Sequence, residues 1–385
     1  MDKNDKTLLL LLLAVVVLTA GCKGKPKLFK HKVKTTLEKH LTPRQLLGKK
    51  LFFDESLSNP PGESCATCHD PLRGYEDIKD RAESEGVVKG RFGNRNAPTA
   101  AYAAFSPYFH YDSKEQQYAG GQFWDGRAPN LMRQAQGPLL NPLEMNNPDK
   151  KSVIEKIRKA GYKDLFESVY GPGSLDDVET AYDFTGDAIA TYEGSADLNP
   201  LSSKYDLYLE GKIALSDEEM RGLALFEDEK KGNCAACHPS KPDAEGTPPM
   251  FTDFTYDNLG VPRNPDNPFY KLPKEFNPDG EKYVDLGLGP IVKDPNQNGK
   301  FKVPTLRNVA RTAPYMHNGV FKTLKEVVDF YNTRDTKTWP SPEVPDTVNK
   351  KELGHLGLTA QEVDDIVAFL NTLTDGHGSV VQKEQ

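Results

Sequence analysis

Two short stretches of the chain carry the same pattern, C-x-x-C-H, at residues 65–69 and 234–238. Two thiols at this spacing can form thioethers with the two vinyl groups of one porphyrin. The histidine that follows then lies beneath the ring, where its imidazole can bind the iron. The pattern therefore predicts two covalently attached c-type haems. A redox dithiol or half of a zinc site also uses C-x-x-C, but neither explains a histidine directly after both pairs.

The cysteine inventory agrees with this assignment. The residues predicted to hold the haems are Cys65, Cys68 and His69 in the first motif and Cys234, Cys237 and His238 in the second. The chain has five cysteines, and only Cys22 lies outside the motifs. No pair of cysteines is therefore left for a structural disulfide.

The N-terminus has the pattern of an export signal. Residues 8–18 form an unbroken apolar run that follows two lysines. This run is too short to span a bilayer and has the length of a signal-peptide core. The small residues before Cys22 predict lipoprotein cleavage, with ordinary signal cleavage nearby as the alternative. We expect a signal peptide at 1–22, a basic tether at 23–36, and a protein on the periplasmic side, held to the membrane by lipid on Cys22 only.

The length and net charge of the chain limit the number of domains and the kinds of partner. A chain of 385 residues suggests two domains. Its net charge of −7 argues against nucleic acid as a partner.

An internal repeat precedes the two motifs. Residues 41–54 and 215–228 each open with a hydroxyl N-cap candidate, Thr42 or Ser216, and continue with apolar residues at helical spacing. We therefore expect one unit used twice, a helix that leads into a haem loop, as in cytochrome c domains. The expected division is an N-terminal domain at 37–198, a C-terminal domain at 199–375 and a tail at 376–385.

The remaining patterns are mostly helical. Helical spacing of apolar residues extends over 152–169, 178–192, 323–331 and 359–373, whereas residues 239–300 are rich in Pro, Gly, Asn and Asp. Alternation with a period of two is almost absent. The sequence therefore predicts a mainly α fold, with two cytochrome c-like haem domains and long irregular loops.

From residue 41 to 373 the chain resembles the bacterial dihaem cytochrome c peroxidase family, which includes the MauG branch. Besides the haem motifs, the resemblance is carried by R-N-A-P-T at 95–99, F-W-D-G-R at 123–127, G-P at 137–138, N-P-L-E-M at 141–145, V-P-T-L-R-N-V at 303–309 and A-P-Y-M-H-N-G at 313–319. In that family the N-terminal haem is the peroxide site and the C-terminal haem transfers electrons.

The resemblance implies roles for single residues of this chain. Glu144 matches the acid-base residue beside the peroxide site, and Gln134 and Pro138 match residues that line the same pocket. The alternative for Glu144 is an ordinary carboxylate at the start of a helix. Trp124 matches the tryptophan that lies between the two haems, although a tryptophan in such a turn is more often a core residue.

The resemblance also implies one calcium ion at the domain interface. Asn96, Thr312 and Pro314 match the residues that hold it. Thr312 and Pro314 would contribute main-chain carbonyls, because calcium takes several oxygen ligands.

The first haem departs from the typical family pattern. Typical members have a second histidine ligand on the loop before the N-A-P-T motif, and Val88 stands at that position here. The nearest substitute is His110. We expect instead a haem with an open sixth position, ready for peroxide without prior reduction.

The second haem departs as well. Its typical sixth ligand is a methionine fourteen residues after the histidine that corresponds to His317, and this position is Tyr331. MauG has a tyrosine ligand there, and a phenolate favours ferric and higher iron. Tyr331 also lies on the apolar face of a predicted helix and could belong to the core. Met316 is the rival ligand, with Met250 as a weaker one.

These features predict a peroxidase that reduces hydrogen peroxide with electrons from a small cytochrome c or cupredoxin. A MauG-like oxidase would instead use peroxide to oxidise a partner protein. A plain electron-transfer cytochrome would leave Glu144 and Pro138 without a role, and a purely structural lipoprotein is excluded by the haem motifs. The resemblance also allows a homodimer.

Overall fold

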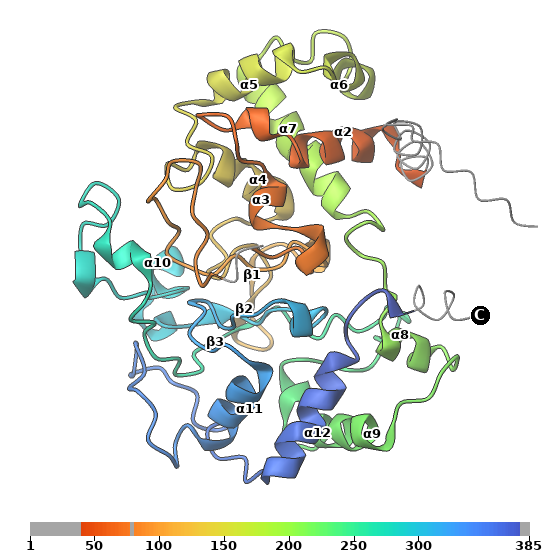
Figure 1. Ribbon diagram of the computed structural model, residues 1–385, viewed down its shortest axis with the longest axis vertical. Coiled ribbons are helices and arrows are strands. Elements are labelled where there is room, and N and C mark those ends of the chain that lie inside the picture. The colour runs from red at the N-terminus through yellow and green to blue at the C-terminus, as the bar shows by residue number, and fades with distance from the viewer. Residues whose placement is uncertain (1–39, 78–80, 378–385) are drawn as a thin grey trace, which may run out of the picture. The chain divides into compact units, whose positions relative to one another are not determined.

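The helices of the chain gather in two groups, each around its own hydrophobic core (Figure 1). The structure is a computed structural model that describes residues 40–77 and 81–377. Residues 41–385 belong to one compact unit. The predicted signal peptide, tether, Cys22 and most of the tail lie outside the described residues, and the boundary between 198 and 199 stays a prediction.

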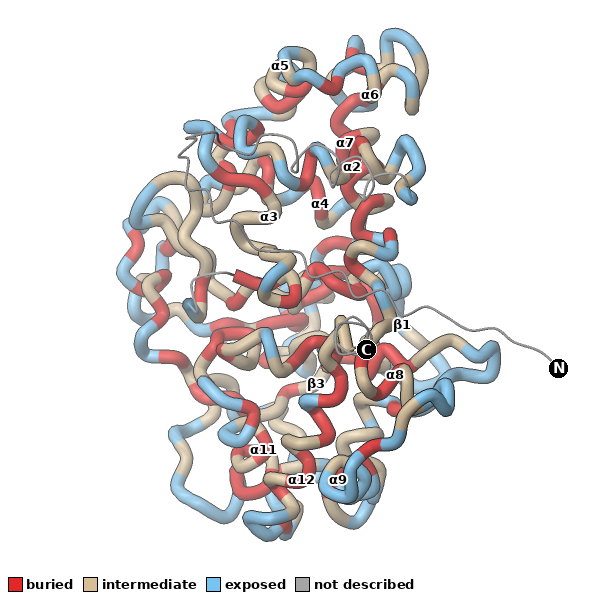
Figure 2. Tube along the Cα trace, turned by 45° about the vertical axis from the view of Figure 1, so that its right-hand side comes forward, coloured by how far each residue is buried: buried red, intermediate tan, exposed pale blue. Residues whose placement is uncertain are grey.

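The first group, which we call the first lobe, surrounds a core whose residues lie between Leu47 and Leu198. Its helices are α2 (Pro43–Phe52), α3 (Cys65–Cys68), α4 (Leu131–Leu140), α5 (Lys150–Lys159), α6 (Lys163–Tyr170) and α7 (Val178–Glu193). The second group, the second lobe, surrounds a core between Tyr205 and Leu373. Its helices are α8 (Lys204–Leu209), α9 (Asp217–Glu227), α11 (Leu324–Thr333) and α12 (Ala360–Asn371), whereas the short α10 (Gly289–Val292) lies apart from this core (Figure 1). Figure 2 shows buried positions along α7 and in segments between the two groups.

The predicted repeat folds as two equivalent helices. Thr42 caps α2 in a capping box with Gln45, and Ser216 caps α9 in a capping box with Glu219. In each box the hydroxyl accepts from the backbone N–H three residues on, and the longer side chain accepts from the cap's own N–H. Each cap supplies partners for orphan N–H groups of the first turn. The N-caps predicted at Thr42 and Ser216 are confirmed.

A glycine at the same repeat position allows each helix to cross its neighbour closely. A Cβ on Gly48 of α2 would lie 1.9 Å from the carbonyl oxygen of Ala188 in α7. A Cβ on Gly222 of α9 would lie 1.9 Å from the carbonyl oxygen of Asp365 in α12. No side chain fits at such a distance, so both crossings require glycine. The two lobes therefore share one helix-crossing geometry.

Short strands lie between the two groups of helices (Figure 1). The first hairpin pairs β1 (His110–Asp112) with β2 (Gln117–Ala119), and the second sheet pairs β3 (Tyr256–Asp257) with β4 (Phe301–Lys302), both antiparallel. A bridge between Ala119 and Thr255 joins the hairpin to the second sheet. The strands are few and short, so the prediction of a mainly helical chain is confirmed.

Two local predictions need correction. The single helical pattern at 152–169 forms α5 and α6, because Ala160 is extended and ends α5. Residues 131–140 form α4, which the sequence pattern does not predict because Pro138 is an unusual residue inside a helix. Between 239 and 300 the chain has only short turns of helix and β3, as expected. Among the described residues, no helix is both long and apolar enough to cross a membrane.

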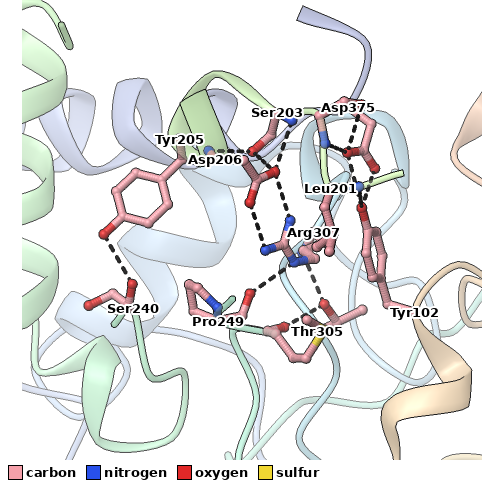
Figure 3. A network of polar contacts seen from close by, with 12 residues as sticks. Tyr102, Leu201, Ser203, Tyr205, Asp206, Ser240, Pro249, Thr305, Arg307 and Asp375 are labelled. Atoms are coloured by element: carbon pink, nitrogen blue, oxygen red, sulfur yellow. Dashed lines mark hydrogen bonds and ion pairs between the residues drawn. The ribbon is translucent and has the colours of Figure 1, made fainter. Parts of the chain in front are cut away.

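A buried ion pair and its hydrogen bonds connect segments that are far apart in the sequence (Figure 3). Arg307 is 1% exposed and donates from its two terminal nitrogens to Asp206 at 3.0 and 2.9 Å. Its Nε donates to the Pro249 carbonyl at 2.9 Å, and its guanidinium lies 4.8 Å from the ring of Tyr102. The hydroxyl of Tyr102 donates to Asp375 near the end of the chain. The network thus ties a loop of the first lobe to the second.

Candidate active site

The first C-x-x-C-H motif lies on a one-turn helix. Cys65 and Cys68 begin and end α3, and His69 follows as its C-cap. One helical turn places the two thiols on the same side. The Nδ1 atom of His69 lies 3.0 Å from the Tyr75 carbonyl oxygen, which orients the ring. Burial lowers the pKa of His69, so the imidazole is neutral and able to bind a metal.

The second motif has the same arrangement on a 3₁₀ turn, Cys234–Ala236. The Nδ1 atom of His238 lies 2.7 Å from the Phe251 carbonyl oxygen. Burial lowers the pKa of His238 to about 4 and raises that of Cys234 to about 12. A backbone carbonyl on Nδ1 leaves Nε2 as the nitrogen for iron. Both donor sets therefore fit a c-type haem, with two neighbouring thiols and one oriented imidazole.

Glu144 faces a cavity beside the end of α4. The cavity is lined by Arg127, Pro138 and Glu144, with Phe123 and Asn141 at its rim. The Oε2 atom of Glu144 is buried and has no hydrogen-bond partner. Burial raises the pKa of Glu144, while the charge of Arg127 and a hydrogen bond from Asn141 oppose the shift. A carboxyl group with a raised pKa holds its proton at higher pH than an ordinary glutamate and can therefore serve as an acid-base group.

Gln134 and Pro138 are four residues apart on α4 and therefore share one face of the helix. Only Pro138 lines the cavity of Glu144. The structure thus brings Pro138 and Glu144 together and leaves Gln134 one turn back along the helix.

The loop that contains Val88 packs against the turn that contains Glu144. The N–H of Val87 donates to the Glu144 carbonyl at 3.0 Å, and a Cβ on Gly86 would lie 2.2 Å from the carbonyl oxygen of Leu143. His110 lies elsewhere, on the exposed hairpin, with Nδ1 2.8 Å from the Tyr108 carbonyl oxygen. It lines neither the cavity of Glu144 nor the cavity beside the second C-x-x-C-H motif.

The second motif opens on another cavity, which is lined by residues of both lobes. Its lining includes His238, Tyr331, Met316 and Trp124. Burial raises the pKa of Tyr331, and the nearby thiols of Cys234 and Cys237 act in the same direction. Tyr331 therefore lies beside the haem-attachment residues. Met250 is absent from the lining and packs in a separate small cluster with Ala101 and Tyr102.

Trp124 connects loops of both lobes. Its Nε1 donates to the Asn96 carbonyl at 2.9 Å, and its own carbonyl accepts from the backbone N–H of Lys302 at 2.8 Å. Asn96 belongs to the first lobe, and Lys302 belongs to β4 beside the second. Trp124 is thus held in place from both sides.

The three residues matched to calcium binding all line the cavity at the second motif. They are Asn96, Thr312 and Pro314. The N–H of Asn96 donates to the His317 carbonyl at 2.8 Å, and its side-chain Nδ2 is buried without a partner. Within the described part of the chain, no cluster of three or more His, Cys, Asp or Glu side chains could hold a metal ion.

Sequence reasoning missed a buried charge cluster next to Trp124. Arg95 pairs with Asp125 at 2.7 Å and with Asp285 at 2.6 Å. Burial alone would raise the pKa of Asp285, but the charge of Arg95 outweighs it, and the net shift is downward. Phe301 lies under the same guanidinium and stacks on His317 at 3.6 Å. Arg95 belongs to the R-N-A-P-T motif at 95–99, but no sequence pattern near Asp285 indicates that it pairs with Arg95.

Comparisons with known proteins agree with this geometry. The sequence profile of the family described as di-haem cytochrome c peroxidase matches residues 43–214, and that of cytochrome c matches residues 219–374. Methylamine utilization protein MauG of Paracoccus denitrificans is 40% identical over 349 residues, covering 86% of this chain and 88% of that protein. Cytochrome c551 peroxidase of Nitrosomonas europaea is 32% identical and covers 85% of this chain and 79% of its own length.

Solved structures give the same result. The diheme peroxidase BthA from Burkholderia thailandensis superposes with a TM-score of 0.77 at 36% identity, covering 86% of each chain. Each matched profile contains one C-x-x-C-H motif. The prediction of two cytochrome c-like domains is therefore confirmed, and these domains imply haem c.

Proposed function

This chain belongs to the di-haem cytochrome c peroxidase family of oxidoreductases, and from this premise we propose that His69 holds the haem at which peroxide is reduced. We propose that His238 holds the haem that delivers the electrons. The family implies peroxide as the acceptor and a cytochrome as the electron donor. A cupredoxin as an alternative donor is part of our proposal.

When bound at the two motifs, c-type haem supplies an iron that can bind peroxide or exchange electrons. The protein supplies the proton transfers. Peroxide loses a proton from one oxygen, and the departing oxygen must gain one. The observation that supports Glu144 in both steps is its buried, unpartnered Oε2 atom beside a cavity. Its raised pKa suits a group that first accepts and then returns a proton.

Other residues shape the surroundings of Glu144. Arg127 places a positive charge near Glu144, and Pro138 contributes an apolar part of the cavity lining. Gln134 lies one turn back on the same face of α4, outside the cavity lining, and we propose that it acts from there. We propose that Trp124, held between the lobes, couples the two sites, and that Tyr331 is the second axial ligand at the His238 haem, in preference to Met316.

Three further parts of the proposal concern the surroundings of the sites. Asn96, Thr312 and Pro314 would hold one calcium ion through oxygen atoms, and their shared position on one cavity supports this assignment. Cys22 would carry lipid and keep the protein on the periplasmic side of the envelope. A homodimer is compatible with the family resemblance.

The test of this function is Glu144→Gln. Peroxide reduction should fall by about two to four orders of magnitude, the usual effect of losing an acid-base group. Both haems should remain, since a glutamine side chain keeps nearly the same volume as glutamate. Glu179→Gln is the matched control, because Glu179 is an exposed residue on α7 that pairs only with Lys150 among described residues. Near-normal turnover in Glu144→Gln would refute the role of this residue.

A MauG-like oxidase is the second candidate function. It is favoured by Tyr331, which stands where typical peroxidases have methionine, and by the 40% identity to MauG. Rapid steady turnover of peroxide with a reduced cytochrome supports the peroxidase. A slow reaction with that donor, combined with a long-lived oxidised state after peroxide addition, would support the oxidase.

A further inference from the structure

We propose that Tyr111 on the β1–β2 hairpin is a second oxidation site, at which small phenolic donors deliver electrons through a series of aromatic rings that leads to Trp124. This inference rests on the proposed function, because peroxide reduction supplies the oxidising equivalents. It adds a donor class and a surface site to that function.

Four rings form the series. Tyr111 contacts Tyr118 with ring centroids 4.9 Å apart. Tyr118 stacks on Phe109 at 5.6 Å with an interplanar angle of 7°. Phe109 meets Tyr256 edge-on at 6.0 Å. Each distance lies within the range of direct aromatic contact. The rings thus make a continuous path from the exposed hairpin to β3.

The inner end of the series reaches the turn that carries Trp124. Tyr256 pairs with Lys302 in the second sheet, and the N–H of Lys302 donates to the Trp124 carbonyl at 2.8 Å. Gly126 is two residues after Trp124 and has φ of 73°. A Cβ there would lie 2.3 Å from the hydroxyl of Tyr256 and 2.7 Å from the ring of Phe109. Only glycine allows the turn to contact both rings so closely.

The hairpin is fixed to this position by its backbone. Ala119 bridges to Thr255, and the N–H of Gly120 donates to the Phe254 carbonyl at 2.9 Å. Figure 1 shows β1, β2 and β3 close together between the two groups of helices. The ring series is therefore held by main-chain contacts at its inner end.

Proton chemistry identifies which ring can hold the oxidised state. A phenol gives up its proton when it loses an electron, and this proton needs an acceptor. The hydroxyl of Tyr256 donates to the Gly120 carbonyl at 2.6 Å, and a carbonyl does not take a proton. Burial also raises the pKa of Tyr256. Phe109 has no acidic proton. These two rings therefore act as bridges, whereas Tyr111 is 51% exposed and can release its proton to water.

Exposed aromatic side chains near Tyr111 in the sequence suit an aromatic donor. Phe105 and Tyr108 precede the hairpin and are 38% and 64% exposed. A flat phenolic ring can stack on such a surface. Tyr108 itself lies outside the series, because it makes no ring contact with another aromatic among the described residues and its hydroxyl accepts from Asn130.

The reaction balances with phenols as the only reductant. Reduction of peroxide to two waters consumes two electrons and two protons. Tyr111 supplies one electron inward and becomes a tyrosyl radical, with its proton released to water. A phenolic donor then returns one electron and one proton to Tyr111 and leaves as a phenoxyl radical. After two such cycles, one peroxide and two phenols have become two waters and two phenoxyl radicals.

The experiment uses the protein with both haems, peroxide, and either guaiacol or reduced cytochrome c as donor. Tyr111→Phe should lower guaiacol oxidation by about tenfold, since the ring remains but cannot form a neutral radical. Its reaction with reduced cytochrome c should not change. Tyr108→Phe is the control, because it removes an exposed phenol three residues before Tyr111 without interrupting the series. Electron paramagnetic resonance after peroxide addition without donor should show a tyrosyl radical that Tyr111→Phe loses.

The outcomes separate this inference from the proposed function. Equal guaiacol rates in Tyr111→Phe and Tyr108→Phe would overturn the inference. Turnover with cytochrome c but none with guaiacol would also overturn it while the proposed function stands. A protein that reduces peroxide with neither donor would refute the proposed function and the inference together.

Discussion

The two haem-attachment motifs share their local geometry and differ in the cavities that lie beside them. At each site a neighbouring carbonyl orients the histidine, and a capped helix with a glycine crossing precedes the motif. Beyond that unit the sites diverge. The first has a carboxyl group and an arginine at a cavity, and the second has a partly buried tyrosine within its cavity. The repeated unit thus presents the haem-attachment residues in the same way, while the residues outside the repeat give each motif a different cavity.

The largest expected effect tests the open position at the first site. Val88 has no donor atom for iron, so the resting ferric protein should bind cyanide without prior reduction. Val88→His should abolish that binding, because the imidazole would occupy the sixth position. Absorption and electron paramagnetic resonance spectra report the change.

His110→Ala serves as the control for this experiment. It should leave cyanide binding unchanged, since His110 lies on the hairpin and lines neither cavity. If the unmodified protein is fully low-spin and gains cyanide binding only in His110→Ala, the contrast between the two sites is wrong.

The next largest effect is a loss of unfolding free energy in Arg307→Met, which should be confined to the second lobe. Arg307→Met leaves Asp206 as a buried, unpaired charge, which costs about 3–5 kcal/mol of unfolding free energy. Burial alone would raise the pKa of Asp206, but Arg307 and other hydrogen bonds lower it overall. The pair's stabilisation is therefore present above the ordinary carboxyl pKa and lost as pH falls through the lowered value.

Denaturant unfolding followed at each haem band measures this effect. Lys325→Met is the control, since Lys325 of α11 and its partner Asp364 of α12 are 50% and 48% exposed and this surface pair should contribute much less. Equal losses in the two variants would show that the Arg307 network does not stabilise the second lobe.

Tyr331→Phe should alter one site only. Loss of the phenol oxygen should change the spectrum and raise the potential of the His238 haem, or open its sixth position. Cyanide binding at the His69 haem should stay the same. If Met316→Leu changes the second haem and Tyr331→Phe does not, methionine is the ligand and the two sites differ less than we propose.

The smallest effect is a pH dependence that only the first site should show. Glu144 must be ionised to accept a proton from peroxide, and its pKa is raised by burial. The rate should therefore fall as pH drops through a value above that of an ordinary glutamate. Glu144→Gln should remove this acidic limb. A limb at the ordinary glutamate pKa would mean that burial does not tune this carboxyl group.

Sequence reasoning reached the parts of the fold that depend on local pattern. Thr42 and Ser216 were identifiable as caps because capping chemistry acts over three residues. Helix α4 was missed because Pro138 argues against a helix, and its pyrrolidine is tolerated only near the end at Leu140. The ion pair of Arg95 with Asp285 spans 190 positions and leaves no local pattern. The roles of Glu144, Trp124 and Tyr331 came from resemblance, and they stay predictions.

The position of Arg95 has a kinetic consequence. Its guanidinium pairs with Asp125, which follows Trp124, and with Asp285, which lies in the irregular stretch 239–300. All three side chains are largely buried. Separating the lobes at this joint would break the buried Arg95–Asp285 ion pair, which resists such a motion. If Trp124 couples the two sites as we propose, electrons would travel a fixed distance without waiting for one lobe to diffuse toward the other, and the transfer rate should be independent of solvent viscosity.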